Sequence, residues 1–492
     1  MIRAYSVSDV RSAEDAVRAG LEDGELMQRA AKGLAEVAAA RLPQGGSRVT
    51  VLVGNGGNGG DALFAAARLA IENLNVVVVL TGSSEHEAGL NAARDASVVV
   101  TEWRSGSPAS EVRDALAEAD MVIDGILGIG ARPGLPDHLT GLPDLIGSEA
   151  FVLAVDLPSG CDPAGQVYAD SLYADETVTF GMAKPVHLMP ATEQTIGLLT
   201  VIDIGVLEPK TIAVQRISHN DILDLWPLPG PDDDKYSRGV LGVVAGGKHY
   251  TGAPIMSVTA AVTAGVGMVR YIGPDAPTNL LRQLVPEAIF GDGKVHAWVI
   301  GSGLMVNDAS DEEMQVARAA IASDLPVLLD AGGLDLLDSP RSGPTLLTPH
   351  EGELLRLAKR LGIRSEDGDE FFGDDVHDAP VVVARKVADH LQATVLLKGS
   401  VTVVVSPTET GLPTYTQADA PAWLATAGAG DALGGICGAL LAAGLTSSVA
   451  GALGALVHGV AADQANPGGP VRALDIAHQV GRTVAYLLAL PQ

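Results

Sequence analysis

The sequence predicts an α/β protein in two parts, each built around a parallel β-sheet. Short apolar segments typical of strands alternate with Ala-rich segments typical of helices, and the alternation starts again after a proline-rich stretch at residues 226–234. Two glycine-rich segments, 54–61 and 426–431, each end in an aspartate. Strands that alternate with helices form parallel sheets, which bind ligands beyond the carboxyl ends of their strands. We therefore expect two separate small-molecule sites.

Composition and charge narrow the class of protein. The chain has 492 residues, of which 47% are hydrophobic, so it can bury a sizeable core. It carries 60 acidic and 32 basic residues, a net charge of −28, which disfavours nucleic acid and membrane surfaces as partners. Its two cysteines, Cys161 and Cys437, form no disulfide framework, and no signal segment opens the sequence. We expect a cytoplasmic protein.

The first half is expected to run as follows. An Ala-rich helix leads into a short apolar strand, the glycine-rich segment forms a turn, and a helix and further strands follow. The predicted helices are 12–40 and 61–70, and the predicted strands are 49–53, 76–80, 121–123 and 152–155. The last two strands lead directly to Asp124 and Asp156.

The second half follows a boundary at residues 208–238. A helix is expected to contain Pro254 in its first turn, where proline is tolerated. The acidic segment 365–378, interrupted by glycine, is predicted to be a solvated loop. The stretch 432–462 lacks Asp, Glu, Lys and Arg, but a turn at 444–448 leaves each apolar half too short to span a membrane, so two buried helices are predicted. Strands are expected at 240–245, 268–272, 297–300, 327–329 and 394–397.

The first glycine motif, Gly54-x-Gly56-x-x-Gly59, fits the dinucleotide-binding fingerprint. However, the next strand ends in Thr81-Gly82 rather than in an acidic residue. Asp61 would also lie in the first helical turn, where a pyrophosphate disfavours a carboxylate, so it suits ligand hydroxyls better. A tight strand-to-helix turn without a ligand is the alternative, although so many Gly and Asn residues favour a ligand.

Two aspartates follow strands whose carboxyl ends are expected at the same edge of the sheet as the glycine motif. Asp124 and Asp156, with Asn58 and Ser159, offer oxygen ligands for a hard cation and a spare carboxylate for acid–base chemistry. A single strand-end aspartate is more often a helix cap or a turn former. Both interpretations remain open from spacing alone.

The motif Thr426-Ala427-Gly428-Ala429-Gly430-Asp431 precedes a long apolar helix. Backbone N–H groups of Ala429, Gly430 and Asp431 would point at an anion, with the helix dipole behind them. Asp431 could then take the proton from a substrate hydroxyl that attacks a phosphoryl group. The alternative is an aspartate-capped buried helix.

Three weaker patterns complete the second half. Residues 398–402 follow a strand and could hold nucleotide phosphates or form a hairpin, and His350 alone would usually be structural. The near P-loop 242–248 is rejected, because His249 replaces the Ser or Thr that holds Mg²⁺ and Gly242 lies within a strand.

Together these motifs resemble the bifunctional NAD(P)H-hydrate repair enzyme family. The stretches similar to its NAD(P)H-hydrate epimerase domain are 51–61, 124–134, 152–162 and 174–185. The stretches similar to its ADP/ATP-dependent NAD(P)H-hydrate dehydratase domain are 239–254, 299–303, 326–337, 346–353, 398–402 and 426–435. The combined order is specific to this family, whereas no single motif is.

The resemblance implies a Rossmann-like three-layer epimerase domain over residues 1–215 and a ribokinase-like α/β dehydratase domain over residues 225–492. The implied function is nicotinamide nucleotide repair, in which an isomerase interconverts the R and S hydrates of NADH and NADPH (NADHX and NADPHX) and a lyase dehydrates the S form at the expense of ADP or ATP. K⁺ in the epimerase site, Mg²⁺ with the nucleotide, and a homo-oligomer are also implied.

The resemblance further implies residue roles. Asp431 and Asp156 would be catalytic, and Asn58, Asp124 and Ser159 would hold K⁺. The hydrate would contact Gly57, Asn58, Gly59, Gly60, Asp61, Gly128, Ile129, Gly130, Ala131, Arg132, Pro133, Gly134 and Asp156 in one half, and Ala253, Gly303, His350 and Asp431 in the other. The nucleotide would contact Lys398, Gly399, Ser400, Val401, Thr402, Gly428, Ala429 and Gly430.

The chain departs from the family pattern at four positions. Gly57 replaces an asparagine, Ala62 a glycine, Gly332 an aspartate and Ala429 a threonine. Backbone donors survive the Ala429 change, whereas the Gly57 change removes a side-chain amide. The alternative enzyme is a ribokinase-like kinase for a vitamin-precursor alcohol, fused to a nucleotide-binding domain. A nucleotide-sensing protein without turnover is the alternative from another class.

Overall fold

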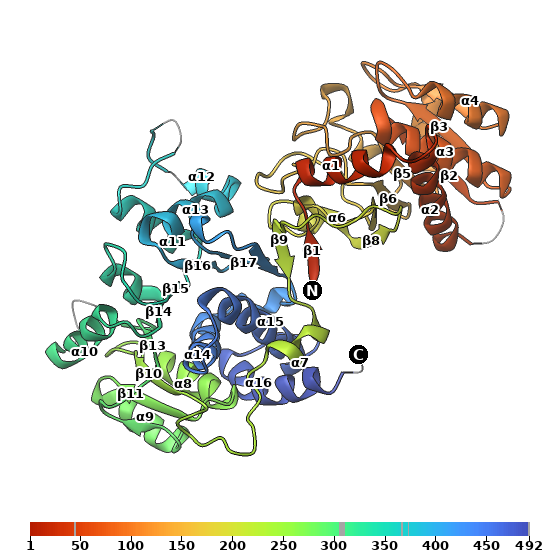
Figure 1. Ribbon diagram of the computed structural model, residues 1–492. Helices are drawn as coiled ribbons and strands as arrows, with labels where there is room; N and C mark the ends of the chain where they lie inside the picture. Colours follow the sequence, from red (N-terminus) through yellow and green to blue (C-terminus); the bar gives the residue numbers. More distant parts are fainter. Residues whose placement is uncertain (44–45, 305–309, 366–367, 372, 491–492) are drawn as a thin grey trace. The chain divides into compact units, whose positions relative to one another are not determined.

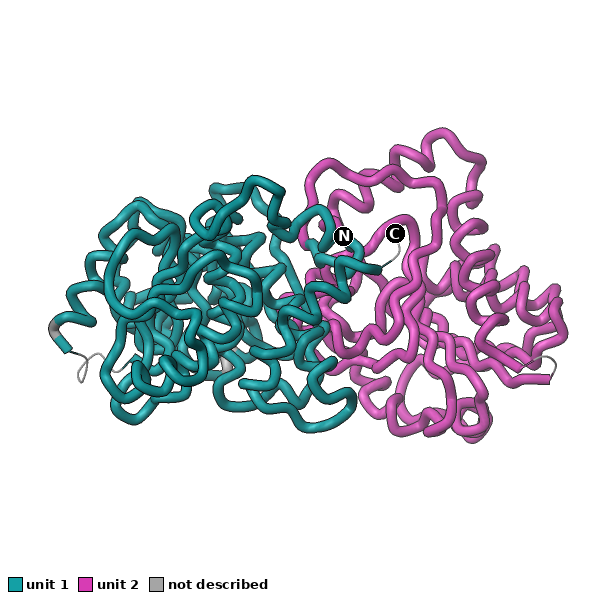
Figure 2. Tube along the Cα trace, turned by 90° about the horizontal axis from the view of Figure 1, so that it is seen from below, with its two compact units in different colours: residues 1–2, 215–492 teal, residues 3–214 magenta. Residues whose placement is uncertain are grey.

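The chain folds into two compact units, each with its own sheet and core. The computed structural model describes residues 1–43, 46–304, 310–365, 368–371 and 373–490. Residues 3–214 form one unit, and residues 1–2 with 215–492 form the other (Figure 2). The boundaries between the two units fall within strands β1 (Ile2–Ala4) and β9 (Val214–Arg216).

The N-terminal unit is built on a seven-stranded sheet of order β4-β3-β2-β5-β6-β7-β8. Every neighbouring pair in it is parallel, so the carboxyl ends of all strands meet at one edge. The strands are β2 (Arg48–Val53), β3 (Asn75–Leu80), β4 (Val99–Glu102), β5 (Met121–Gly125), β6 (Phe151–Val155), β7 (Glu176–Phe180) and β8 (Leu198–Ile202).

Helices cover both faces of this sheet (Figure 1). Successive strand residues point to opposite faces. Val51 packs in a core with Leu34 of α2 and Leu63 of α3, whereas Leu52 packs in a separate core with Val112 and Leu116 of α5. The predicted three-layer α/β arrangement is confirmed. The helices are α1 (Val7–Arg18), α2 (Glu25–Arg41), α3 (Gly56–Ile71), α4 (Glu87–Asp95), α5 (Ser110–Ala117) and α6 (Glu193–Ile196).

Two predictions for this unit were wrong. The helix expected at 12–40 is two helices, because Gly24, at φ 79°, begins α2 in a left-handed conformation. The glycine segment is mostly helix rather than turn, since α3 begins at Gly56, and Asp61 therefore lies in the second turn of α3. A Cβ on Gly59 would come within 2.2 Å of the Gly54 carbonyl oxygen, so close packing of helix on strand requires glycine there.

The C-terminal unit has a mixed sheet in which the strands run in the order β18-β17-β16-β15-β14-β13-β10-β11-β12. Strands β10 to β16 pair in parallel, and β16, β17 and β18 are antiparallel. The strands are β10 (Val240–Val244), β11 (Met268–Ile272), β12 (Ile289–Phe290), β13 (Ala297–Ile300), β14 (Val327–Leu329), β15 (Thr345–Leu347), β16 (Thr394–Leu397), β17 (Thr402–Val405) and β18 (Thr414–Gln417).

Long apolar helices form the core on one face of this sheet. The uncharged stretch 432–462 gives two packed helices, α14 and α15, as predicted, and α14 packs on β13. Within the described residues, no helix combines the length and apolar character needed to cross a bilayer. The helices are α7 (Ile222–Leu225), α8 (Gly252–Thr263), α9 (Asp275–Leu284), α10 (Asp311–Ala322), α11 (Glu351–Arg360), α12 (Gly373–Asp378), α13 (Pro380–Leu391), α14 (Ala429–Ala442), α15 (Ser447–Ala465) and α16 (Ala473–Leu488).

The predicted loop at 365–378 was wrong for its last six residues. Residues 373–378 form the short helix α12, which contacts α11 and α13. So short a helix depends on tertiary packing rather than on its own propensity, and sequence patterns do not reveal such packing. Residues 366–367 and 372 of the same prediction lie outside the described residues.

Candidate active sites

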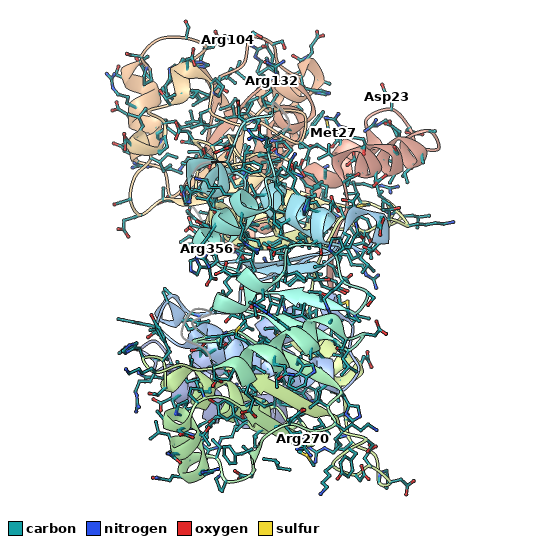
Figure 3. The ribbon with its side chains drawn as sticks, turned by 90° about the vertical axis from the view of Figure 1, so that its left-hand side faces the viewer. Asp23, Met27, Arg104, Arg132, Arg270 and Arg356 are labelled. Carbon is teal, nitrogen blue, oxygen red and sulfur yellow. The ribbon has the colours of Figure 1, made fainter. Side chains whose placement is uncertain are left out.

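A cavity of about 1090 Å³ opens at the carboxyl edge of the N-terminal sheet. Segments that follow β2, β3, β5 and β6 line it, together with α1 and the start of α2. Met27 of α2 and Arg104, which follows β4, belong to its wall and are labelled in Figure 3. This is the edge at which parallel α/β sheets bind ligands.

Most residues predicted to bind the hydrate in this unit lie at the cavity. Gly59 and Gly60 are buried in the packing of α3, and Arg132, Pro133 and Gly134 lie beyond the lining. The predicted residues that line it are Gly57, Asn58, Asp61, Gly128, Ile129, Gly130, Ala131 and Asp156.

Asp156 is held in a strained and tightly bonded position. Its φ of 70° is left-handed, which is uncommon outside glycine and recurs at functional sites. Its Oδ1 accepts hydrogen bonds from Lys184 Nζ at 2.5 Å and from Thr179 Oγ1 at 2.9 Å. Burial alone would raise the pKa of Asp156, but the Lys184 ammonium outweighs burial and lowers it. Asp156 is therefore ionised at neutral pH.

Asp61 has the opposite environment in the same cavity. Burial raises its pKa well above the usual value, and the negative charges of Asp156 and Glu14 raise it further. Lys184 and Glu14 were missed by sequence reasoning. The only signal for Lys184 is a charge within the otherwise uncharged stretch 177–186.

The three predicted K⁺ ligands lie close together at the cavity, where Leu127 bonds to both Asn58 and Ser159. The Asp124 carboxylate is fully buried and accepts hydrogen bonds from Ser159 N at 2.7 Å and Ser159 Oγ at 2.6 Å. Asn58 Nδ2 donates to the carbonyls of Leu127 and Val155 at 2.7 and 3.0 Å. Burial raises the pKa of Asp124 to about 6, and no basic side chain of the described residues pairs with it.

These oxygens fit a monovalent cation better than a transition metal. A buried carboxylate without a basic partner gains from a positive charge, and carbonyl and hydroxyl oxygens suit a hard ion. No group of three or more His, Cys, Asp or Glu side chains suited to a metal ion occurs among the described residues. The donor set is thus compatible with K⁺.

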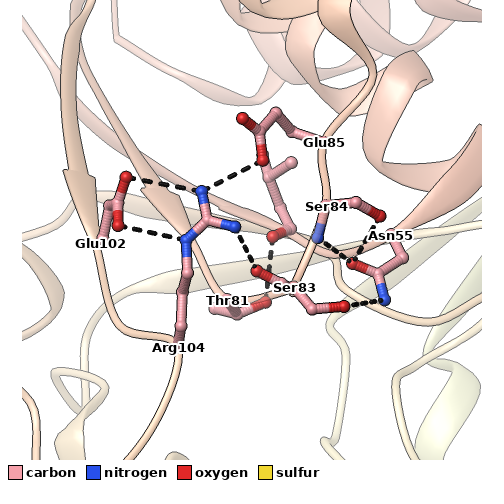
Figure 4. Close-up of polar contacts among 9 residues, drawn as sticks. Asn55, Thr81, Ser83, Ser84, Glu85, Glu102 and Arg104 are labelled. Carbon is pink, nitrogen blue, oxygen red and sulfur yellow. Dashed lines mark hydrogen bonds and ion pairs between the residues drawn. The ribbon is translucent and has the colours of Figure 1, made fainter.

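The outer wall of the cavity is a polar corner, shown in Figure 4. Arg104 donates to the Gly82 carbonyl at 2.8 Å, to Glu85 at 3.0 Å and to Glu102 at 3.1 Å. Asn55 Oδ1 accepts from Ser84 N at 3.0 Å. A guanidinium with two carboxylate partners is largely neutralised, so this corner offers directional hydrogen bonds rather than net positive charge.

In the C-terminal unit, charged side chains gather beyond the carboxyl ends of neighbouring strands. Asp330 follows β14, Glu353 lies in the first turn of α11 after β15, and Lys398 follows β16. Lys398 Nζ lies 2.8 Å from Asp330 Oδ1 and 3.5 Å from Glu353 Oε2. Burial alone would lower the pKa of Lys398, but the two carboxylates outweigh burial and raise it. Lys398 therefore stays protonated.

The predicted anion-binding turn begins α14 at this same place. Gly428, at φ 91°, precedes the first helical residue, Ala429. A Cβ on Gly430 would lie 3.3 Å from Lys398 Nζ, so the first turn of α14 approaches the Lys398 ammonium. This is a strongly anion-attracting position.

Asp431 stands in the first turn of α14 beside this charge cluster. Ser257 Oγ donates to its backbone carbonyl at 2.9 Å, which ties it to α8. Burial and, after it, the charge of Asp330 raise the pKa of Asp431 to about 6, and the nearby Ser302 hydroxyl lowers it in part. At neutral pH Asp431 is an ionised carboxylate close to its titration, as a general base requires.

The other predicted residues of this unit lie on several different elements. Ala253 and Gly303 are neighbours, because a Cβ on Gly303 would come 3.0 Å from Ala253 Cβ. His350 is the N-cap of α11, where Nδ1 accepts from Gly352 N at 3.1 Å. Residues 398–401 connect the antiparallel strands β16 and β17, so this segment is the hairpin that the alternative interpretation foresaw.

Sequence reasoning missed three residues of this cluster: Asp330, Ser302 and Glu353. Asp330 and Ser302 each follow a short apolar strand, as Asp124 and Asp156 do in the first unit. The same strand-end signal could have found them.

Known proteins are similar to this chain over most of its length. A family model described as NAD(P)H-hydrate dehydratase matches residues 241–479, and one described as YjeF-related protein N-terminus matches residues 23–186. A protein from Mycobacterium leprae named bifunctional NAD(P)H-hydrate repair enzyme Nnr is 40% identical over 485 residues, which cover 94% of each chain. A protein of the same name from Mycobacterium tuberculosis H37Rv is 40% identical over 467 residues, 91% of each chain.

Among solved structures, a crystal structure of ADP/ATP-dependent NAD(P)H-hydrate dehydratase from Bacillus subtilis is similar to part of the chain. It is 22% identical, with a TM-score of 0.49, and the match covers 56% of this chain and 99% of that one. This likeness is too weak to carry a conclusion.

Proposed function

The chain belongs to the family of bifunctional NAD(P)H-hydrate repair enzymes, and we propose that it divides the two activities between its two units. The function is nicotinamide nucleotide repair, by an epimerase and a dehydratase activity. Residues 1–215 form the epimerase domain and residues 225–492 the dehydratase domain. Within the second activity, the S hydrate is the substrate, and ADP, or ATP, accompanied by Mg²⁺ is the co-substrate.

The dehydratase must remove hydroxide, which is a poor leaving group. Asp431 takes the proton from the substrate hydroxyl as that oxygen attacks the terminal phosphate of the nucleotide. The ring nitrogen lone pair then expels phosphate, a good leaving group, and the reduced nicotinamide is restored. Lys398 and the N–H groups of Ala429 and Gly430 stabilise the charge that develops on the phosphoryl oxygens.

In the epimerase site, Asp156 is the acid–base group that acts on the hydrated carbon. Its pairing with Lys184 keeps it ionised, so it can accept a proton. Asn58, Asp124 and Ser159 would hold K⁺, which would supply a fixed positive charge to the site. Hydrate-binding roles are proposed for the predicted residues that line the cavity: Gly57, Asn58, Asp61, Gly128, Ile129, Gly130, Ala131 and Asp156.

One observation carries the proposal for the dehydratase. An ionised aspartate with a pKa near neutrality stands at the N-terminus of α14, and Gly430 of the same turn approaches a lysine ammonium. A kinase site would use the same arrangement but would release a stable phosphoester. The kinase alternative leaves the cavity of the N-terminal unit without a role.

A coupled assay on separated R and S hydrates, with ADP or ATP, tests this function. We expect the S hydrate to yield NAD(P)H and one phosphate per turnover, and the R hydrate to do so only after epimerisation. Phosphate release without recovery of the NAD(P)H absorbance, or a phosphorylated alcohol product, would favour the kinase. Nucleotide binding without turnover would favour the sensing protein.

Expectations about cellular location and oligomeric state are also part of the proposal. The unpaired and buried Cys161 and Cys437 support a cytoplasmic location. A homo-oligomer is expected from the resemblance alone.

A further inference from the structure

The carboxyl group of Asp61 forms no hydrogen bond that would stabilise the fold, among the residues that the structure describes. It lines the cavity of the N-terminal unit from the second turn of α3, half-buried. Its carboxyl group has no hydrogen-bond partner among the residues that the structure describes, whereas Asp156 in the same cavity has two. A carboxyl group that lines a cavity without a partner from the protein is available to a ligand or a reaction.

We propose that Asp61 is the proton donor of the epimerase site, which protonates the departing hydroxyl while Asp156 takes a proton from the water that enters on the other face of the ring. This inference rests on the proposed epimerase function and adds a second catalytic residue to it.

The two carboxyl groups reach the cavity from different elements of the fold. Asp61 stands on a helix wall of the cavity, and Asp156 stands at the end of β6, pinned by Lys184 and Thr179. Their environments shift the two pKa values in opposite directions, upward for Asp61 through burial and nearby negative charge, and downward for Asp156 through Lys184. Two titratable groups in one site whose pKa values are shifted in opposite directions are typical of an acid and a base. Inversion of a stereocentre by water needs both, one on each face.

The proposed steps balance. Asp61 gives its proton to the hydroxyl at the hydrated carbon, the carbon–oxygen bond breaks, and the ring nitrogen lone pair forms a carbon–nitrogen double bond as water leaves. A second water attacks the same carbon from the opposite face, the double-bond electrons return to nitrogen, and Asp156 takes the proton. Proton transfer through cavity water returns the proton to Asp61, and the reverse reaction exchanges the two roles.

The charges around Asp61 come from several elements. Asp156 and Glu14 act on it with negative charge, and Lys184 with positive charge. Arg11, Asp15 and Arg18 on α1 and His86, the N-cap of α4, also line the cavity. Glu14 supports the protonated form of Asp61 without itself taking part in the reaction.

The first test is Asp61→Asn in the full-length protein. We expect kcat for epimerisation to fall by about 10²- to 10⁴-fold, the usual contribution of a positioned acid, with KM changed by no more than a few-fold. Thermal unfolding of the N-terminal unit in the same preparation is the control for folding, because dehydration of the S hydrate reports only on the other unit. An unchanged epimerisation rate would overturn the proposal, whereas a wild-type protein that does not epimerise at all would overturn the proposed function instead.

Two further measurements separate an acid from a merely structural residue. Wild-type epimerisation should lose rate at alkaline pH as Asp61 ionises, and Glu14→Gln should move that limb to lower pH, because removal of a negative charge lowers the pKa of Asp61. In water of heavy oxygen, each epimerisation should place one labelled oxygen on the product. Retention of the original oxygen, or an alkaline limb that Glu14→Gln leaves in place, would refute the role even if Asp61→Asn proved unstable.

Discussion

The Lys184 ammonium donates a hydrogen bond of 2.5 Å to Oδ1 of Asp156, and both side chains are buried. Thr179 and the left-handed backbone at Asp156 complete the arrangement. A charge removed from water is tolerated when its partner is present and costly when the partner is lost. The pair therefore couples the stability of the N-terminal unit to the ionisation of its proposed base.

Lys184→Met should abolish epimerisation at neutral pH and destabilise the protein by about 3–5 kcal/mol. Because pairing lowers the pKa of Asp156, the stabilisation is present above the unfolded pKa of an aspartate and is lost as pH falls through the lowered value. The difference between wild type and variant in denaturant unfolding should shrink in acid. Lys184→Arg is the matched control, and a Lys184→Met variant as stable and active as wild type would contradict the role of the pair.

Asp431→Asn should remove dehydration but spare epimerisation. The same change should stabilise the protein, because the raised pKa, from 3.8 to about 6, means that folding disfavours the ionised form. The expected gain is up to about 3 kcal/mol at pH above that value, and it should vanish in acid, where both folded and unfolded states are protonated. Thermal unfolding at neutral and acidic pH measures it. Normal dehydration by Asp431→Asn would show that another group is the base.

The dependence of the dehydration rate on pH should reflect the pKa of Asp431. With saturating nucleotide and S hydrate, kcat should fall about tenfold per pH unit below about 6, since a protonated Asp431 cannot accept a proton. Asp330→Asn should move this acid limb to lower pH, because the Asp330 charge is the second cause of the raised pKa. A limb unaffected by Asp330→Asn would point to a different titrating group.

Two neighbouring glycines of α3 should respond differently to alanine. Gly59→Ala would place a Cβ 2.2 Å from the Gly54 carbonyl oxygen, so the helix must shift, and we expect a loss of about 1–3 kcal/mol. Gly57→Ala meets no atom within 4 Å and should stabilise the helix by up to about 1 kcal/mol. Unfolding by urea compares the two, and equal effects would mean that packing at Gly59 is loose.

Potassium should stabilise the N-terminal unit specifically. If Asp124, Asn58 and Ser159 bind K⁺, the melting temperature should rise with KCl and not with choline chloride at equal ionic strength, because a ligand that binds only the folded state favours it. Asp124→Asn should remove that difference while dehydration of the S hydrate persists. An equal response to both salts would argue against the site.

Several elements follow from local sequence. The strands near Val51, Ile123 and Leu328 are short runs of apolar residues, and the uncharged stretch 432–462 with its central turn defines α14 and α15. Such patterns determine secondary structure because one face must be buried wherever the chain folds. The short helix α12 has no such pattern, since it depends on its neighbours α11 and α13.

By itself, the sequence determined the α/β class, the restart of the pattern after residue 234, and the positions of Asp156 and Asp431 at strand and helix ends. Only the tertiary structure decided which distant charges meet them. Lys184 beside Asp156, and Lys398 beside Asp330 and Gly430, are separated along the chain by 28, 68 and 32 residues respectively. Burial and these partners set each carboxyl group's pKa, and both arise only when the strands of a sheet bring their ends together.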